Sequence, residues 1–382
     1  MYKTIEELVT RIDEKNSDGT VSELIGVSID KCFIKSVANT NGTDLSKYKI
    51  IRKNDFAVSL MQVSRDGKIP VARLEEYEEA IMSPAYPIFR VKDKNVILPE
   101  YLEMWFKRPE FDREAAFIAV GGVRGSMPWE EFAKMKLPVP PIEKQRKIVN
   151  AYKIVTDRIA LKQKINDNLA NTEQLILYQA ISKNQTIPLS LNEIAEFIDG
   201  DRGKNYPTFD EFSTSGFCLF LNASNVTSSG FNFDSCMFVT EEKDKIMRNG
   251  HLLLNDIVFT SRGTLGNVAL YDKNIKYKNV RINSGMLIIR PKGINLSPYF
   301  IYALLKSNYM KSAIEQFRSG SAQPQLPIKD LQNITFDIPE SQNVLDDLEY
   351  RFFEIEETIS INKREIGNLS ELASILLARL SR

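Results

Sequence analysis

Histidine is nearly missing from this chain, because His251 is the only one among 382 residues. A Ser–His–Asp triad or a histidine-rich metal site is therefore nearly excluded, and we expect no bound metal. Cysteine is scarce too: Cys32, Cys218 and Cys236 form no Cys-x-x-Cys pair, which favours reduced thiols in a cytoplasmic protein over a disulfide framework. No apolar run approaches the roughly 20 residues that cross a bilayer, and the N-terminus lacks a signal-peptide pattern.

An excess of either charge is also absent, since 50 basic and 50 acidic residues cancel. This balance argues against a protein that coats nucleic acid by charge alone, but it allows a local basic face. No Walker A sequence occurs, and the glycines at 121, 122 and 125 follow a helix, which is the wrong context for a dinucleotide turn. An Asn-Pro-Pro-aromatic motif of amino-methyltransferases is missing as well. The sequence therefore predicts no catalytic residues and no cofactor bound by the chain itself.

What the chain does contain is a second copy of itself. Leu137-Pro-Val-Pro-Pro141 and the helical pattern behind it return about 200 residues later, as Phe336-Asp-Ile-Pro-Glu340 and a second helical pattern. Upstream, Asn54-Asp55 matches Asn255-Asp256 at the same period. A period this long indicates a duplicated globular unit plus a helix, not a solenoid of short repeats.

The duplication predicts an α+β protein in which two pseudo-repeated α/β heads are separated by two long antiparallel helices that form a coiled coil. We expect the first head at residues 1–141 and the second head at residues 185–340. The long helices are expected at 142–184 and 341–382. Each would be roughly 60 Å long at about 1.5 Å per residue.

Turn residues divide each head into short elements. In the first head we expect a short amphipathic helix over Ile5–Ile12, strands at Leu24–Ile29, Phe56–Met61, Ala80–Met82 and Ile88–Val91, and a helix over Pro99–Lys107. In the second head the same order gives a short helix over Leu191–Phe197, strands at Cys218–Leu221, Asp256–Thr260, Val268–Tyr271 and Met286–Arg290, and a helix from Ser297 to about Gln316.

Both long helices carry a heptad seam, with apolar residues at alternating three- and four-residue steps. The polar Lys162 falls at the position that Asn362 holds in the second helix. Because such a seam usually packs against another helix, we expect the two copies to pair. The predicted seam consists of Ile148, Tyr152, Val155, Ile159, Leu169, Ile176, Leu348, Phe352, Ile355, Ile359, Asn362, Ile366, Leu369 and Leu376.

Loops rich in Ser, Thr, Asn, Gln, Gly and Arg occur at matching places in the two heads. Ser59–Gly67 corresponds to Ser261–Gly266, and Gly121–Ser126 corresponds to Arg318–Gln325. These side chains can read base edges or hold phosphates. A single loop of this kind is more often only a polar turn, but the match in both heads favours a DNA-contacting surface. The candidate DNA-binding residues are Arg65, Lys68, Arg124, Ser126, Arg202, Lys204, Asn222, Ser224, Ser261, Arg262, Thr264, Arg318, Ser321, Gln323 and Gln325.

Over nearly its whole length the chain resembles the specificity subunit of type I restriction–modification systems. Leu137-Pro-Val-Pro-Pro-Ile-Glu-Lys-Gln145 is similar to the start of that family's central helix, and Ile338-Pro-Glu-Ser-Gln342 is similar to its distal counterpart. Gly266-Asn-Val-Ala-Leu270 and Gly320-Ser-Ala-Gln-Pro-Gln-Leu326 resemble the second recognition domain. The first head departs from the pattern, because Gly121-Gly-Val-Arg-Gly-Ser-Met127 replaces the loop that contains Gln-Pro.

The resemblance implies a non-catalytic subunit whose heads each read one half of a bipartite double-stranded DNA target, with the helices setting the spacer. Two methyltransferase subunits would carry S-adenosylmethionine, motor-nuclease subunits would join them, and no membrane would be involved. The alternative from the residues alone is a two-headed, non-catalytic scaffold that binds proteins, which the neutral net charge favours. A solitary hydrolase with an unrecognised carboxylate site is a third hypothesis.

Overall fold

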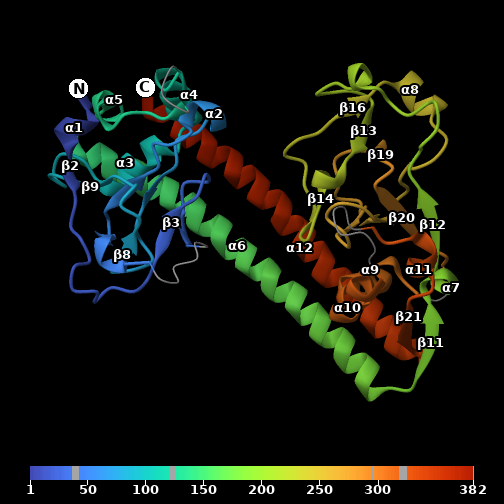
Figure 1. Ribbon diagram of the computed structural model, residues 1–382. Helices are drawn as coiled ribbons and strands as arrows, with labels where there is room; N and C mark the ends of the chain where they lie inside the picture. The colour runs from blue at the N-terminus through green and yellow to red at the C-terminus, as the bar shows by residue number, and fades with distance from the viewer. Residues whose placement is uncertain (37–42, 121–124, 294–295, 318–324, 382) are drawn as a thin grey trace. The chain divides into compact units, whose positions relative to one another are not determined.

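The computed structural model describes residues 1–36, 43–120, 125–293, 296–317 and 325–381. The chain forms two compact units. The first unit contains Met1–Leu161 and Ile366–Arg382, and the second contains Lys162–Glu365. Each unit therefore holds one head and a part of each long helix, and both chain termini belong to the first unit (Figure 1).

The first head is built from short strands followed by three helices. Its elements are β1 (Tyr2–Thr4), α1 (Ile5–Leu8), β2 (Val9–Ile12), β3 (Ile25–Val27), β4 (Phe33–Lys35), β5 (Lys49–Arg52), β6 (Phe56–Val58), α2 (Val63–Asp66), β7 (Val71–Arg73), β8 (Glu79–Met82), β9 (Ile88–Val91), α3 (Pro99–Phe106), α4 (Pro109–Ile118), α5 (Trp129–Lys134) and β10 (Lys136–Pro138).

The second head repeats this plan with additional short strands. Its elements are β11 (Thr186–Ser190), α7 (Leu191–Ile194), β12 (Ala195–Asp199), β13 (Cys218–Leu221), β14 (Val226–Thr227), β15 (Gly230–Phe231), β16 (Phe238–Val239), α8 (Glu241–Ile246), β17 (Ile257–Thr260), β18 (Val268–Leu270), β19 (Val280–Ile282), β20 (Met286–Pro291), α9 (Pro298–Lys306), α10 (Asn308–Phe317), α11 (Ile328–Gln332) and β21 (Thr335–Pro339).

Both heads contain the same four-stranded antiparallel sheet. Its strand order is β2-β9-β6-β7 in the first head and β12-β20-β17-β18 in the second. Alternate residues of the central strands face two different cores. In the second head Phe259 and Ile289 pack in the core that includes residues of α9 and α10, whereas Val258 and Ile288 pack against β13 and β19. The expectation of an α+β head, built twice, is confirmed.

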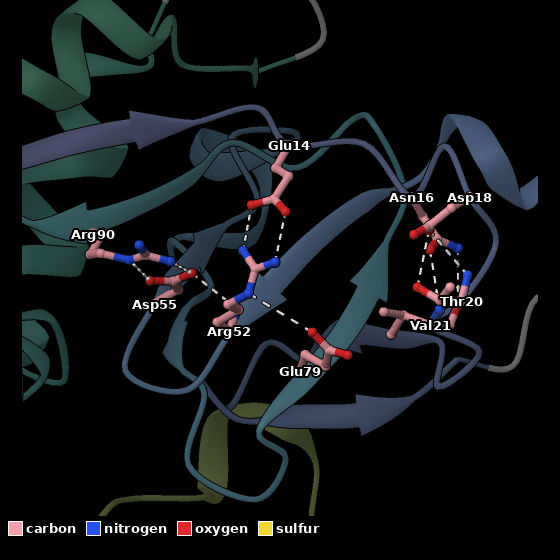
Figure 2. A network of polar contacts seen from close by, with 9 residues as sticks. All are labelled: Glu14, Asn16, Asp18, Thr20, Val21, Arg52, Asp55, Glu79 and Arg90. Carbon is pink, nitrogen blue, oxygen red and sulfur yellow. Dashed lines mark hydrogen bonds and ion pairs between the residues drawn. The ribbon is translucent and has the colours of Figure 1, made fainter.

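A buried aspartate fixes the same corner of each head. Asp55 accepts hydrogen bonds from the Arg90 guanidinium (Nη2–Oδ2 2.9 Å) and from the backbone N–H of Arg52 (3.0 Å). Figure 2 shows this network, in which the Arg52 guanidinium also reaches Glu14 and Glu79. Because a buried carboxylate is costly without such donors, these hydrogen bonds hold the start of β6 in place.

The second head repeats the corner with different neighbours. Asp256 accepts from the Arg290 guanidinium (Nη2–Oδ2 2.7 Å) and from the backbone N–H of Leu253 (2.7 Å). The preceding residues, Asn54 and Asn255, have φ values of 70° and 72°, in the left-handed region that asparagine tolerates better than most residues. The repeated Asn-Asp pair of the sequence thus marks a tight turn before the same strand of each head.

Two of the predicted helices were wrong beyond their first turn. The expected helix over Ile5–Ile12 is α1 followed by β2, and the one over Leu191–Phe197 is α7 followed by β12. The apolar positions of the first segment suit either structure, but β2 completes the sheet by pairing with β9. Tertiary strand pairing therefore overrides a helical period that is only two turns long.

The helix predicted from Ser297 to about Gln316 was also wrong, because two helices occupy this segment. α9 ends at Lys306, and the extended backbone of Ser307 separates it from α10. The Ser307 hydroxyl accepts a hydrogen bond from the N–H of Met310 at 3.1 Å, so it caps the second helix. In the first head Arg108 divides α3 from α4 in the same way, since the residue before Pro109 avoids the helical conformation.

The long helices are α6 (Ile142–Lys183) and α12 (Gln342–Ala378). In the second unit they run side by side in opposite directions (Figure 1): Lys162 contacts Asn362, and Ile176 lies near Leu348. In the first unit, Leu377 and Leu380 of the chain's last turns share a core with Ile148 and Tyr152 of α6. The two helices therefore pair in antiparallel fashion in the second unit.

Candidate nucleic-acid interface

Three loops of the second head meet at Asn283–Gly285, the short link between β19 and β20. Ser261 donates its N–H to the carbonyl of Gly285 at 3.0 Å. Arg202 donates from Nη2 to the Ser284 carbonyl at 3.3 Å, and Asn283 donates its N–H to the carbonyl of Leu221, just before Asn222. The structure thus brings together the ends of β12, β13, β17 and β19, which carry most of the candidate residues of this head.

The loop before α11 pairs with the loop after β17 through a β-bridge. Arg262 is the bridge partner of Gln325, and Leu326 donates its N–H to the carbonyl of Ser261 at 3.3 Å. Thr264 follows in an exposed turn. Three further predicted residues of this loop, Arg318, Ser321 and Gln323, lie outside the described residues.

The first head brings its matching loops together in the same way. Met127 donates its N–H to the carbonyl of Leu60 at 2.8 Å, which joins the segment before α5 to the loop after β6. A side chain at Gly125 would clash with the Ser64 hydroxyl at 2.5 Å, so this approach requires glycine. Ser126 is half-buried, whereas Arg124 lies outside the described residues.

Several candidate polar groups are engaged in holding the loops. Ser261 is buried, and its hydroxyl donates to the Gly285 carbonyl at 3.1 Å. Asn222 accepts from the Ser224 N–H at 2.9 Å and from the Ser224 hydroxyl at 2.6 Å, which closes a turn. These three residues shape the surface in this structure, whereas the side chains of Arg65, Lys68, Arg202 and Lys204 are exposed cations.

Three of the four exposed cations form surface ion pairs. Arg65 lies 2.8 Å from Asp66, and Arg202 lies 2.9 Å from Asp199. Lys68 is 3.9 Å from Asp30, and Lys204 is exposed. Ion pairs in water contribute about 0–1 kcal/mol, so these cations can exchange a carboxylate for a phosphate at little cost.

Sequence reasoning missed two parts of this surface. Asn283–Gly285 forms its centre, and an Asn-Ser-Gly turn between two strand-like runs was the available signal. Asp201 was also missed: it is 9% exposed and accepts the N–H groups of Gly203 and Arg248, each at 2.9 Å. These hydrogen bonds lower the pKa of Asp201 and fix the loop that carries Arg202 and Lys204.

The predicted seam residues lie on the inner side of the helices. Val155, Leu348, Phe352, Ile359 and Asn362 are buried. The other predicted members are half-buried: Ile148, Tyr152, Ile159, Leu169, Ile176, Ile355, Ile366, Leu369 and Leu376. Asn362 forms a polar layer in the second unit, since it accepts from Lys162 Nζ at 2.8 Å and donates to Asn166 at 2.8 Å.

A buried charged triad joins the second head to both helices. Lys306 at the end of α9 lies 2.7 Å from Glu173 of α6 and 2.5 Å from Glu356 of α12. Glu173 is 0% exposed, and burial raises its pKa to about 8, against the opposing effect of Lys306. With Glu173 protonated, the triad carries one positive and one negative charge, so it is neutral where it is least hydrated.

Within the described residues, no group of three or more His, Cys, Asp or Glu side chains is arranged to hold a metal ion. No helix in that part of the chain is long and apolar enough to cross a membrane.

Comparison with known proteins accounts for the duplicated architecture. A family model described as the type I restriction modification DNA specificity domain matches residues 16–171 and again residues 188–367. A specificity subunit of the type I restriction enzyme MjaIX from Methanocaldococcus jannaschii is 21% identical, over 75% of this chain and 69% of that protein. The crystal structure of a type I restriction–modification S subunit from M. genitalium shares the fold, with a TM-score of 0.61, 17% identity and coverage of 100% of this chain and 96% of that one. The two matched segments together span most of the sequence, so the chain belongs to the type I restriction–modification DNA specificity family.

Proposed function

We propose that this chain reads a bipartite DNA sequence, one half with each head, for a type I restriction–modification complex. The main support is that the same surface occurs in both heads. In the first head the loop after β6 is hydrogen-bonded to the segment before α5, and in the second head the loop after β17 is hydrogen-bonded to the segment before α11. Exposed arginines and lysines lie at both surfaces, as direct readout and phosphate contact require.

The same proposal assigns no catalytic step to this chain. Adenine methylation would be carried out by separate methyltransferase subunits that bind S-adenosylmethionine, and motor-nuclease subunits would cleave unmodified DNA. α6 and α12 would hold these partners and set the length of the unspecified spacer. The purified chain alone is then expected neither to methylate nor to cleave DNA, and robust methyl transfer by the chain alone would contradict this assignment.

Methylome sequencing tests the DNA-reading role directly. A host that expresses this chain with its methyltransferase subunit is compared with the same host lacking this chain. We expect a bipartite motif with methylated adenine that disappears when the chain is removed. An unchanged methylome, with the methyltransferase confirmed active, would reject the proposal and favour a protein-binding scaffold.

A further inference from the structure

A shallow pocket of about 330 Å³ opens in the second unit where α9 meets α12. Three aromatic rings and two carboxylates line it: Tyr299, Tyr350, Phe353, Asp346 and Glu349. Aromatic faces attract cations through their electron-rich surface, and carboxylates add a direct charge. This combination of lining groups selects a positively charged ligand.

The chain itself already places a cation on one of these rings. Lys273 Nζ lies 5.5 Å from the centre of the Phe353 ring and 3.4 Å from the Glu357 carboxylate. Phe353 packs edge-on against Tyr299, with the ring centres 5.3 Å apart. Tyr350 is 65% exposed, so its ring is available at the mouth of the pocket.

The pocket lies in a region of negative potential. Burial, together with the nearby carboxylates of Asp272, Glu357 and Glu356, raises the pKa of Tyr299 to about 12. Within the described part of the chain Asp346 accepts from the neutral amide of Gln342, and it is not engaged by a cation. A phosphate would be repelled here, so the surface is unsuited to DNA.

The corresponding surface of the first repeat is built differently. Leu348 and Phe352 of α12 pack on the second head as Ile148 and Tyr152 of α6 pack on the first. At this register Arg146 replaces Asp346, Asn150 replaces Tyr350 and Lys153 replaces Phe353. The α6 face of the first repeat therefore carries positive charge in place of negative charge, and no aromatic residue, at these three positions.

We propose that this pocket binds an arginine side chain presented by the methyltransferase subunit. Arginine suits it better than lysine, because the planar guanidinium stacks on aromatic rings, pairs with carboxylates through two N–H groups and is less strongly hydrated. The inference rests on the proposed function for the identity of the partner. Because the equivalent positions of α6 lack this carboxylate and these aromatic rings, two identical methyltransferase subunits would bind this chain with different affinities.

The test measures binding of the methyltransferase subunit to the full chain by calorimetry at two salt concentrations. For the variant Asp346→Asn/Glu349→Gln we expect the tighter binding step to weaken roughly 10- to 100-fold, with a smaller salt dependence, because a paired charge loses its partner. The control Glu241→Gln/Glu242→Gln removes two exposed carboxylates from α8 and is expected to bind as the unmodified chain does. Unchanged binding by the pocket variant would overturn the proposal.

A photocrosslinking amino acid at position 350 identifies the occupant in the assembled complex. We expect a crosslink to an arginine-containing segment of the methyltransferase subunit, whereas a crosslink to a second copy of this chain would overturn the assignment.

The methylated motif distinguishes a failure of this inference from a failure of the proposed function. If the pocket variant binds normally and the complex of the unmodified chain directs a bipartite methylated motif, only this inference is overturned. If the complex of the unmodified chain directs no chain-dependent motif, the proposed function is overturned.

Discussion

Arg262 stands at the point where two loops of the second head are bridged, with Gln325 opposite it. Arg262 is half-buried, and the hydroxyl of its neighbour Ser261 is held by a hydrogen bond to the Gly285 carbonyl. A side chain with a restricted position and charged donors can form two hydrogen bonds to a guanine edge in the major groove. This residue is therefore a stronger candidate for base reading than the exposed Lys204.

For Arg262→Ala we expect a loss of about 1–3 kcal/mol at the half-site read by the second head, together with relaxed preference at one base pair, because a bidentate contact disappears. Competition binding of the assembled complex, with targets altered in one half-site at a time, measures this.

The matched control is Arg364→Ala, an exposed arginine on α12. It should leave the discrimination between half-sites intact. Equal losses at both half-sites, or none, would remove Arg262 from the set of base-reading residues.

At the scale of elements, the two heads join the helices through different chemistry. Lys107 and Lys306 occupy equivalent positions at the ends of α3 and α9, about 200 residues apart. Lys107 pairs with Glu103 of its own helix at 2.5 Å, whereas Lys306 pairs with Glu173 and Glu356 on two other helices. The junction of the second head with the long helices therefore contains one buried charged residue from each of three helices, α6, α9 and α12.

This junction should make the second unit sensitive to pH. The folded-state pKa of Glu173 is about 8, above its ordinary value of 4.5, because burial disfavours the charged carboxylate. The protonated form therefore belongs to the folded state, and its stabilising effect is complete below pH 4.5 and is lost as pH rises through about 8. Between about pH 6 and pH 9 we expect the free energy of unfolding to fall by about 2–3 kcal/mol. This loss corresponds to a decrease of roughly 5–10 °C in the thermal midpoint.

Replacing Glu173 with Gln keeps the shape of the protonated acid and removes the titration. Glu173→Gln should flatten this part of the pH profile, as seen in thermal melts followed by circular dichroism. Glu354→Gln, an exposed residue of α12, serves as the control and should keep the slope of the unmodified chain. An equally steep profile in Glu173→Gln would show that another group causes the pH dependence.

At the scale of the whole molecule, the proposed role of α6 and α12 is to fix the spacer between the half-sites. Inserting one heptad at equivalent positions in both helices adds about 10 Å at 1.5 Å per residue. Because base pairs are stacked about 3.4 Å apart, the tolerated spacer should lengthen by about 3 base pairs. Methylome sequencing of a host that carries the lengthened chain measures the new motif.

A heptad inserted in only one helix should instead disturb pairing, since Lys162 and Asn362 would no longer meet. That variant should lower the thermal midpoint and abolish chain-dependent methylation. A spacer that stays the same after the matched insertion would reject the spacing role while leaving the reading of the two half-sites in place.

The amino-acid sequence by itself determined the features that depend on local or repeated patterns. The period of about 200 residues identified two heads and two helices. The strand expected at Ile88–Val91 is β9 to the residue, because a β-branched and aromatic run between turn residues has few alternatives. Sequence also placed the long helices, since a heptad pattern sustained over many turns outweighs any single polar residue.

Tertiary structure decided which of these segments meet. α1 gives way to β2 because β9 offers hydrogen-bond partners that lie some 80 residues away in the chain, and no local pattern reports them. The buried state of Ser261, the central place of Asn283–Gly285 and the three-helix environment of Glu173 likewise arise from contacts between distant segments. A sequence pattern records the preferences of neighbouring residues, whereas a binding surface or a buried charge depends on burial, and burial is set only when the whole unit has folded.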